Sequence, residues 1–164
     1  MDTALSAQSL GNPRKEQLRA QIEAGLDEAE RWRKTNEAYH ADDLKFMRFL
    51  IPPGKRVLEL GCGRGDLLAA LKPSYGVGID FGAETIQKAN ARHPDLYFVL
   101  GDVEDPATLE GIEGPFDYIV LADTIGMFED IDGTLRRVQH LCTPSTRIII
   151  SYYSHLWEPV LKLA

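Results

Sequence analysis

The stretch VLELGCGRGD, residues 57–66, joins an apolar strand pattern to three glycines within five residues. Glycine loses more conformational freedom on folding than other residues, so a cluster of glycines in an ordered position needs a structural reason. A sharp turn that another group approaches closely supplies one. Because this turn follows a strand and precedes a helix, the stretch predicts a ligand-binding loop. The alternative is a tight strand-to-helix turn that holds no ligand.

Strand and helix patterns alternate on both sides of this stretch. The expected strands cover residues 56–60, 75–80, 96–102, 116–123 and 146–153, and the expected helices cover 66–72, 83–93, 106–112, 133–141 and 157–164. Nearly continuous apolar strands are typical of parallel sheets buried on both faces. We therefore predict an α/β fold: a doubly wound, mostly parallel sheet in three layers, with ligands bound beyond the carboxyl ends of its strands.

The chain divides into three segments by its patterns. Residues 1–12 are small and polar without a period and are expected to be disordered. Residues 13–53 form an N-terminal helical segment that can serve as a lid, with helical patterns from Pro13 and over 41–51. Residues 54–164 form the α/β domain.

Composition excludes several classes of protein. Of the 164 residues, 44% are hydrophobic and 26% charged, which is typical of a single soluble domain, and the net charge of -7 argues against a broad nucleic-acid surface. We expect neither a membrane span nor a signal peptide from these patterns. Its two cysteines, Cys62 and Cys142, are far apart and lack metal-ligand spacing, so we expect reduced thiols in a cytoplasmic protein and no metal.

Three carboxylates accompany the glycine loop. Glu59 lies in the first strand, while Asp80 and Asp102 end the second and third strands. The dinucleotide fingerprint G-x-G-x-x-G would need a third glycine at position 66, where Asp66 stands and would repel a pyrophosphate. The loop therefore favours a ligand without phosphates over a nicotinamide dinucleotide.

With these residues, VLELGCGRG resembles motif I of the class I S-adenosylmethionine-dependent methyltransferases, and the similarity extends from about residue 55 to 153. The resemblance implies that Gly61, Gly63 and Gly65 wrap the aminocarboxypropyl part of S-adenosylmethionine, with Glu59 beneath them. Glu59 can equally order the loop without touching the ligand. In this family the product that remains bound is S-adenosylhomocysteine.

The family pattern also assigns the nucleoside half of the ligand. Asp80 is expected to accept both ribose hydroxyls, since a carboxylate can do so bidentately, and Phe81 to lie against the adenine. Asp102 is expected to accept from the adenine amine, with the backbone N–H of Val103 on a ring nitrogen. The structural alternatives are a helix cap for Asp80, core packing for Phe81 and a turn for Asp102.

The segment ADTIGMFED after the fourth strand is where the family brings the methyl group to its acceptor. Asp123 and Thr124 are pocket candidates there, and the Asn-Pro-Pro-Tyr-like sequence of many nucleobase methylators is absent. The catalytic residue is unknown, because methyl transfer from a sulfonium needs a base only for a protonated acceptor. The candidates for a base are His155 and Tyr39. His155 is near the aromatic residues Tyr152, Tyr153 and Trp157, and Tyr39 with His40 belongs to a lid or an inter-helix turn. Asp117 opens the fourth strand and is expected to be structural.

The chain departs from the family pattern at its end. The final antiparallel hairpin of the family sheet is expected to be absent, which leaves strand 146–153 as an apolar edge and suggests a homodimer through that edge. The segment after residue 150 is similar to methyltransferase units that accompany glycosyltransferase modules in some bacterial chains, which favours a small-molecule or a sugar- or lipid-linked acceptor. The alternatives are an inactive binding or scaffold module and, less favoured, a nicotinamide-dependent reductase.

Overall fold

The computed structural model describes residues 13–17, 20–21, 24–25 and 37–152, and every structural statement below refers to these residues. Five strands form one sheet in the order β3-β2-β1-β4-β5, and every neighbouring pair is parallel. The strands are β1 (Arg56–Leu60), β2 (Tyr75–Asp80), β3 (Tyr97–Leu100), β4 (Phe116–Ala122) and β5 (Cys142–Ser151). The strand order reverses between β1 and β4, which is the switch point where such sheets bind ligands.

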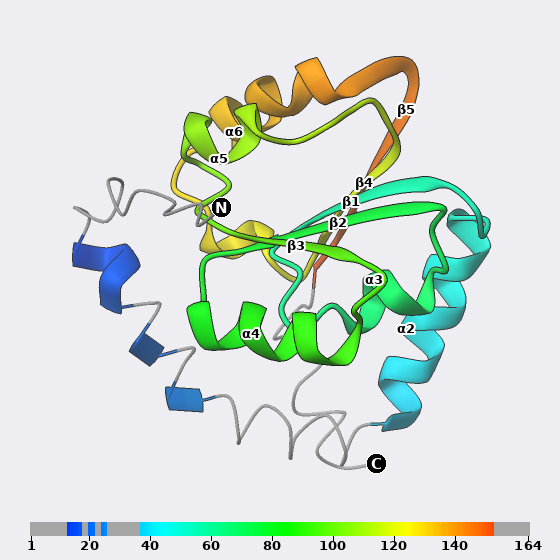
Figure 1. The fold of residues 1–164 in the computed structure, drawn as a ribbon, viewed down its shortest axis with the longest axis horizontal. Helices are drawn as coiled ribbons and strands as arrows, with labels where there is room; N and C mark the ends of the chain where they lie inside the picture. Colours follow the sequence, from blue (N-terminus) through cyan, green and yellow to red (C-terminus); the bar gives the residue numbers. More distant parts are fainter. Residues whose placement is uncertain (1–12, 18–19, 22–23, 26–36, 153–164) are drawn as a thin grey trace.

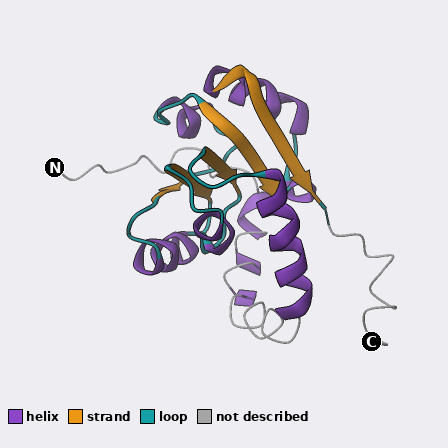
Figure 2. Cartoon of the chain, turned by 90° about the vertical axis from the view of Figure 1, so that its right-hand side faces the viewer, coloured by secondary structure: helices purple, strands orange, loops and turns teal. Residues whose placement is uncertain are grey.

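Helices cover both faces of the sheet, so the predicted three-layer α/β/α architecture is confirmed (Figures 1 and 2). One face carries α2 (Glu37–Leu50), α3 (Asp66–Ala70) and α4 (Ala83–Arg92), and the other carries α5 (Pro106–Glu110) and α6 (Ile131–Arg137). Two short 3-10 turns, η1 (Ile125–Met127) and η2 (Val138–Leu141), follow β4 and α6.

Each face of the sheet has its own apolar core, because side chains alternate along a strand. Leu58 and Leu60 of β1 pack toward Leu109 of α5, whereas Val57 packs with α3 and with Met47 of α2. Met47 is fully buried. Burying a side chain of this kind contributes about 1.5–3 kcal/mol, which fixes α2 against the sheet.

Several expected boundaries differ from the structure, and the starts of α2 and β5 differ by four residues each. Helix α2 begins at Glu37 rather than near 41, so Tyr39 and His40 lie inside this helix and not in an inter-helix turn. Glutamate and alanine are good helix formers, which is why the helix extends N-terminally. Strand β5 begins at Cys142 rather than 146: Cys142 pairs with Phe116, and the ladder resumes only after an irregularity between Phe116 and Tyr118.

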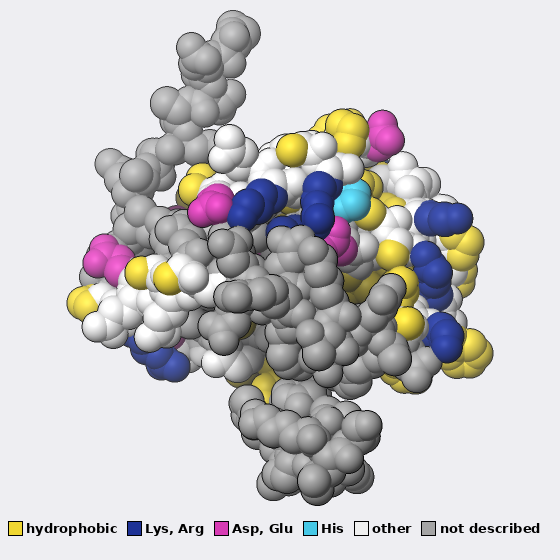
Figure 3. Space-filling model, turned by 90° about the horizontal axis from the view of Figure 1, so that it is seen from below, with side chains coloured by type: hydrophobic (Ala, Val, Ile, Leu, Met, Phe, Trp, Pro, Cys, Tyr) yellow, Lys and Arg dark blue, Asp and Glu magenta, His cyan; other side chains and the backbone are white. Residues whose placement is uncertain are grey.

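Several expectations concern residues outside the described ranges. Residues 1–12 and 153–164 are among them, so the disordered N-terminus and the missing final hairpin stay predictions. No helix of the described ranges is long and apolar enough to cross a membrane. On the face seen in Figure 3, basic and acidic side chains adjoin near the centre, and further Lys and Arg side chains lie along the right side.

Candidate functional site

The glycine loop after β1 adopts the geometry that its composition predicts. Gly61, Gly63 and Gly65 have φ values of 76°, 52° and 73°, in the left-handed region that favours glycine. The N–H groups of Gly61 and Cys62 both donate to the carbonyl of Ile79, at 2.8 and 2.9 Å. The loop is thereby fastened to the carboxyl end of β2, beside the switch point.

The three glycines meet different surroundings. A Cβ on Gly61 would lie 2.3 Å from Cγ2 of Thr124, and one on Gly65 would lie 2.3 Å from the ring of Phe98, so packing excludes side chains at both. A Cβ on Gly63 would meet no heavy atom within 4 Å. Gly63 therefore presents the open side of the loop, from which a ligand can approach the backbone.

Glu59 and Asp80 both lie near the centre of the loop. The side chain of Glu59 is buried, with the residue 3% exposed. Burial, followed by the negative charges of Glu59 and Asp80, raises the pKa of the Cys62 thiol well above its usual value. Cys62 is a free, buried cysteine and is neutral at physiological pH, so it serves here as packing and not as a nucleophile.

Asp80 connects the glycine loop to the turn after β2. Its Oδ2 accepts the backbone N–H of Gly63 at 2.9 Å, and its Oδ1 accepts that of Gly82 at 2.9 Å. It does not cap α4, whose N-cap is Gly82 without a side-chain hydrogen bond. Phe81, the next residue, is partly buried. Asp80 therefore holds the glycine loop and the turn after β2 together at the carboxyl end of β2.

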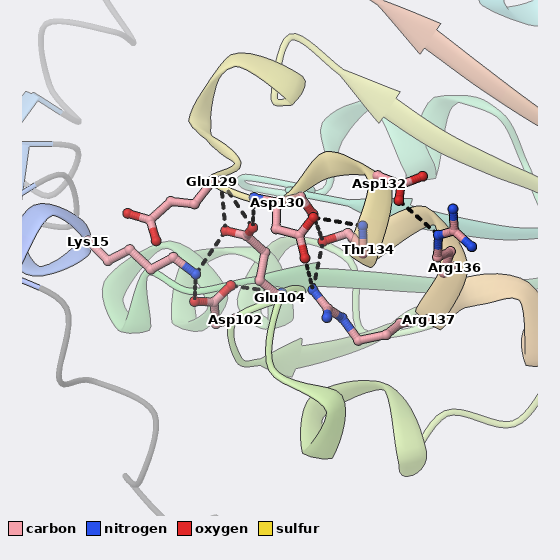
Figure 4. A network of polar contacts seen from close by, with 10 residues as sticks. Lys15, Asp102, Glu104, Glu129, Asp130, Asp132, Thr134, Arg136 and Arg137 are labelled. Carbon is pink, nitrogen blue, oxygen red and sulfur yellow. Dashed lines mark hydrogen bonds and ion pairs between the residues drawn. The ribbon is translucent and has the colours of Figure 1, made fainter.

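Asp102 lies in the turn after β3, the next strand of the sheet. Its Oδ1 accepts the N–H of Glu104 at 2.9 Å, and its Oδ2 forms an ion pair with Lys15 from the helical residues 13–17 (Figure 4). The turn role that the sequence left open for Asp102 is therefore present, together with a cation from the N-terminal segment. The side chain of Val103, which follows, is buried in the core beside α5.

The end of β4 closes the site at the switch point. Asp123 is exposed and has a φ of 55°, and its N–H donates to the carbonyl of Ser151 at 3.1 Å. The buried Thr124 donates its hydroxyl to the carbonyl of Leu60 at 3.0 Å. Of the two pocket candidates, Thr124 lies against the glycine loop at Gly61, as the topology of the sheet predicts, whereas Asp123 contacts the end of β5.

The remaining sequence candidates separate by location. Asp117 accepts the N–H of Arg56 at 2.9 Å, which places it at the amino end of the strands and confirms its structural role. Asp66, at the start of α3, pairs with Arg92 and His93 at 3.4 and 3.2 Å. Tyr39 lies in the first turn of α2. The other base candidate and the nearby aromatic residues lie outside the described ranges: His155, Tyr153 and Trp157.

Sequence reasoning missed two residues that contact Asp102 in the turn after β3. Lys15 belongs to a charged helix pattern, and Glu104 to a turn sequence, so neither carries a local signal of a site. Their ion pair of 2.8 Å joins segments 89 positions apart in the chain. Only the folded structure brings them together. Among the described residues, no group of three His, Cys, Asp or Glu side chains is placed to hold a metal ion.

Comparison with known proteins gives the family. A family described as "Methyltransferase domain" matches residues 31–162. The chain therefore belongs to this family, and the fold and the match together define a class I S-adenosylmethionine-dependent methyltransferase domain.

Individual relatives cover parts of longer proteins. The chain is 35% identical over 112 residues to an arsenite methyltransferase from Aquipseudomonas alcaligenes, covering 60% of this chain and 32% of the relative. It is 31% identical over 97 residues to a fatty-acid O-methyltransferase from Mycolicibacterium smegmatis, covering 56% and 34%. The chain thus spans about a third of the length of these curated relatives.

A solved structure shares the fold. It is an S-adenosylmethionine-dependent methyltransferase from Thermotoga maritima, described as a possible histamine N-methyltransferase. The TM-score is 0.71 at 21% identity, with 86% of this chain and 66% of that chain covered. At this identity, the likeness supports the sheet topology alone.

The residues at the site fit the family's cofactor. S-adenosylmethionine presents hydrogen-bond donors, namely an ammonium, two ribose hydroxyls and an adenine amine, beside a sulfonium cation. The carboxyl ends of β2 and β3 offer the carboxylates of Asp80 and Asp102, and the open side of Gly63 lies beside Asp80. The set of acceptors and the space at Gly63 match a cationic, donor-rich ligand.

Proposed function

We propose that the chain transfers the methyl group of S-adenosylmethionine to a small-molecule or a sugar- or lipid-linked acceptor. The observation that supports this most strongly is the hydrogen bond from the N–H of Gly63 to Asp80. It places a carboxylate that can accept ribose hydroxyls beside the open position of the glycine loop. A dinucleotide would instead place a pyrophosphate near Asp66, whose carboxylate disfavours it.

The roles proposed for the site follow the strand order. Gly61, Gly63 and Gly65 hold the aminocarboxypropyl end above the buried Glu59. Asp80 receives the ribose hydroxyls, with Phe81 beside the adenine. The residues proposed for the adenine and the acceptor side are Asp102, Val103 and Asp123.

The bound cofactor supplies an already activated methyl group on a sulfonium. The chain then contributes approach geometry and exclusion of water, which lower the barrier by restricting the reactants to a productive arrangement. A base is required only when the acceptor arrives protonated, and His155 and Tyr39 are the candidates for this role. Within residues 13–53, the segment proposed as the lid, the helical residues 13–17 reach the site through the contact of Lys15 with Asp102, while Met47 holds α2 against the sheet.

The acceptor class is proposed from two sources. The curated relatives are named for arsenite and for a fatty acid, which supports small or lipid-type acceptors without choosing between them. The net charge of -7 disfavours a polyanionic acceptor such as nucleic acid.

The free thiols of Cys62 and Cys142 support a reducing, cytoplasmic environment.

We further propose that β5 forms an interface with a second copy of the chain. In the sheet, β5 pairs only with β4, so its other edge is open among the described residues. Ile148 and Ile150 on this strand are 42% and 45% exposed. Open apolar edges favour pairing with another chain.

The proposed function is tested by calorimetric titration of the full chain with S-adenosylhomocysteine and, separately, with NADH. We expect saturable binding of S-adenosylhomocysteine and none of NADH. Binding of NADH alone would replace the methyltransferase proposal with the reductase. Binding of neither ligand would favour a scaffold module that keeps the fold.

A further inference from the structure

Glu104 ties together three segments that are distant in the sequence. Its Oε1 accepts the N–H of Asp130 at 2.6 Å and that of Glu129 at 3.0 Å. Its Oε2 forms an ion pair with Nζ of Lys15 at 2.8 Å (Figure 4). The side chain of Glu104 is 8% exposed. A nearly buried carboxylate with these partners holds the N-terminal helical residues, the turn after β3 and the loop after β4 in one arrangement.

The loop after β4, residues 123–130, is fixed at both ends. At its start, the hydroxyl of Thr124 donates to the carbonyl of Leu60, below the glycine loop. At its end, Asp130 caps α6 by accepting the N–H of Gly133 at 2.8 Å, and its own N–H is held by Glu104. The residues in between form η1, where Met127 is 38% exposed. Glu104 therefore determines where the far end of this loop lies.

A continuous series of hydrogen bonds connects the adenine end to this loop. Asp102 accepts the N–H of Glu104 at 2.9 Å, and the side chain of Glu104 in turn accepts the N–H groups of Glu129 and Asp130. Lys15 bridges the carboxylates of Asp102 and Glu104. A hydrogen-bond donor of a ligand at Asp102 shares the Asp102 carboxylate with Lys15. Because Lys15 also pairs with Glu104, binding at Asp102 affects the contacts of both carboxylates.

We propose that Glu104 is a positioning residue that couples occupation of the adenine end to the order of residues 123–130. This inference rests on the proposed function, because it requires that Asp102 receive a donor from the ligand. Ligand binding then restricts the turn after β3, and Glu104 transmits that restriction to the loop beside the acceptor side of the site. In this proposal, Glu104 contacts neither the cofactor nor the methyl acceptor.

The substitutions Glu104→Ala and Glu104→Gln separate the two contributions of this side chain. Alanine removes the acceptor for Glu129 and Asp130 as well as the ion pair with Lys15. Glutamine keeps one oxygen that can accept the backbone N–H groups but loses the charge. Glu110→Ala is the matched control, since Glu110 is an exposed glutamate at the end of the neighbouring α5.

Hydrogen exchange of the full chain, with and without S-adenosylhomocysteine, tests the coupling. In the unsubstituted chain and in Glu110→Ala, we expect the ligand to slow exchange at residues 101–105 and at 123–130. In Glu104→Ala, protection at 101–105 should persist, while the ligand-dependent protection at 123–130 should fall by about tenfold, the scale for hydrogen bonds to a charged group. Glu104→Gln should restore part of it, and it carries the test if the alanine variant does not fold.

The outcomes distinguish this inference from the proposed function. If the ligand changes exchange nowhere in the unsubstituted chain, the proposed function fails and the coupling fails with it. If the ligand protects 101–105 but not 123–130, or protects 123–130 equally in both Glu104 variants and in the unsubstituted chain, the coupling alone is overturned.

Discussion

At the scale of single residues, the glycine loop separates packing from ligand access. Gly61 and Gly63 both have positive φ, yet a Cβ on Gly61 would overlap Thr124, whereas the space beside Gly63 is open. Glycine is therefore required for different reasons at Gly61 and at Gly63, two positions further along the chain. One glycine lets the end of β4 pack against the loop, and the other leaves room for a ligand.

Substitution by alanine should reveal this difference. Left-handed backbone costs a side-chain-bearing residue roughly 1–2 kcal/mol at either position. At Gly61 we expect a further loss of about 1–3 kcal/mol of unfolding free energy, the usual cost of overpacking. Gly63→Ala should instead keep most of the stability and weaken binding of S-adenosylhomocysteine. Urea unfolding and calorimetry measure the two quantities, and equal losses of stability would contradict this assignment.

The residues of the site differ in how far the sequence could predict them. Gly61, Asp80 and Asp102 were predictable, because each stands at the carboxyl end of a strand and the parallel sheet brings these ends together. Lys15 and Glu104 were not, because their ion pair depends on how the N-terminal segment docks. No local periodicity encodes a contact between segments so far apart in the chain.

At the scale of helices and strands, the sheet was predicted more accurately than its connections. Strands β1 and β2 have the expected bounds, because nearly continuous apolar residues end at clear turn signals. The start of α2 differs because Glu37 and Ala38 are good helix formers that extend the helix. The first residues of β5 differ because the pairing of Cys142 with Phe116 is a tertiary effect. Such effects override local propensity at the ends of elements.

The junction of three segments at Glu104 should make stability depend on acid pH. Burial alone would raise the pKa of Glu104, but the hydrogen bond from Lys15 and those from the N–H groups of Asp130 and Glu129 outweigh it and lower the pKa. A carboxyl group whose pKa is lower in the folded state stabilises the fold above its unfolded pKa of about 4.3, and this contribution is lost as the pH falls through the folded pKa.

We therefore expect Glu104→Gln to lose less stability than the unsubstituted chain on acidification from about pH 6 to pH 3, since glutamine does not titrate there. Urea unfolding at several pH values, with Glu110→Gln as the control, measures the difference. Parallel pH profiles for Glu104→Gln and the unsubstituted chain would show that this carboxyl group makes no such contribution.

At the scale of the whole molecule, the open edge of β5 bears on whether two copies of the chain associate. If β5 pairs with a second copy, a lysine in place of Ile150 should prevent it, because charges on an edge strand oppose pairing. Light scattering over a range of concentrations should give a mass that rises for the unsubstituted chain and stays monomeric for Ile150→Lys. Phe49→Lys adds the same charge on α2, at a side chain that is 82% exposed, and should associate as before. A concentration-independent monomer mass for the unsubstituted chain would rule out the interface.

The central claim is that the carboxyl end of the sheet binds S-adenosylmethionine through the glycine loop and Asp80. The most direct measurement is the calorimetric affinity of the full chain for S-adenosylhomocysteine, compared among the unsubstituted chain, Asp80→Ala and Asp95→Ala. Asp95 is an exposed aspartate before β3, at the opposite end of the strands, and its removal should leave the affinity unchanged.

The account predicts that Asp80→Ala weakens binding by about 1.5–3 kcal/mol, the range for hydrogen bonds to a charged group, while the circular dichroism spectrum is preserved. Part of this loss comes from the hydrogen bond that Asp80 accepts from Gly63. An affinity for S-adenosylhomocysteine that is the same in Asp80→Ala as in the unsubstituted chain would contradict the claim.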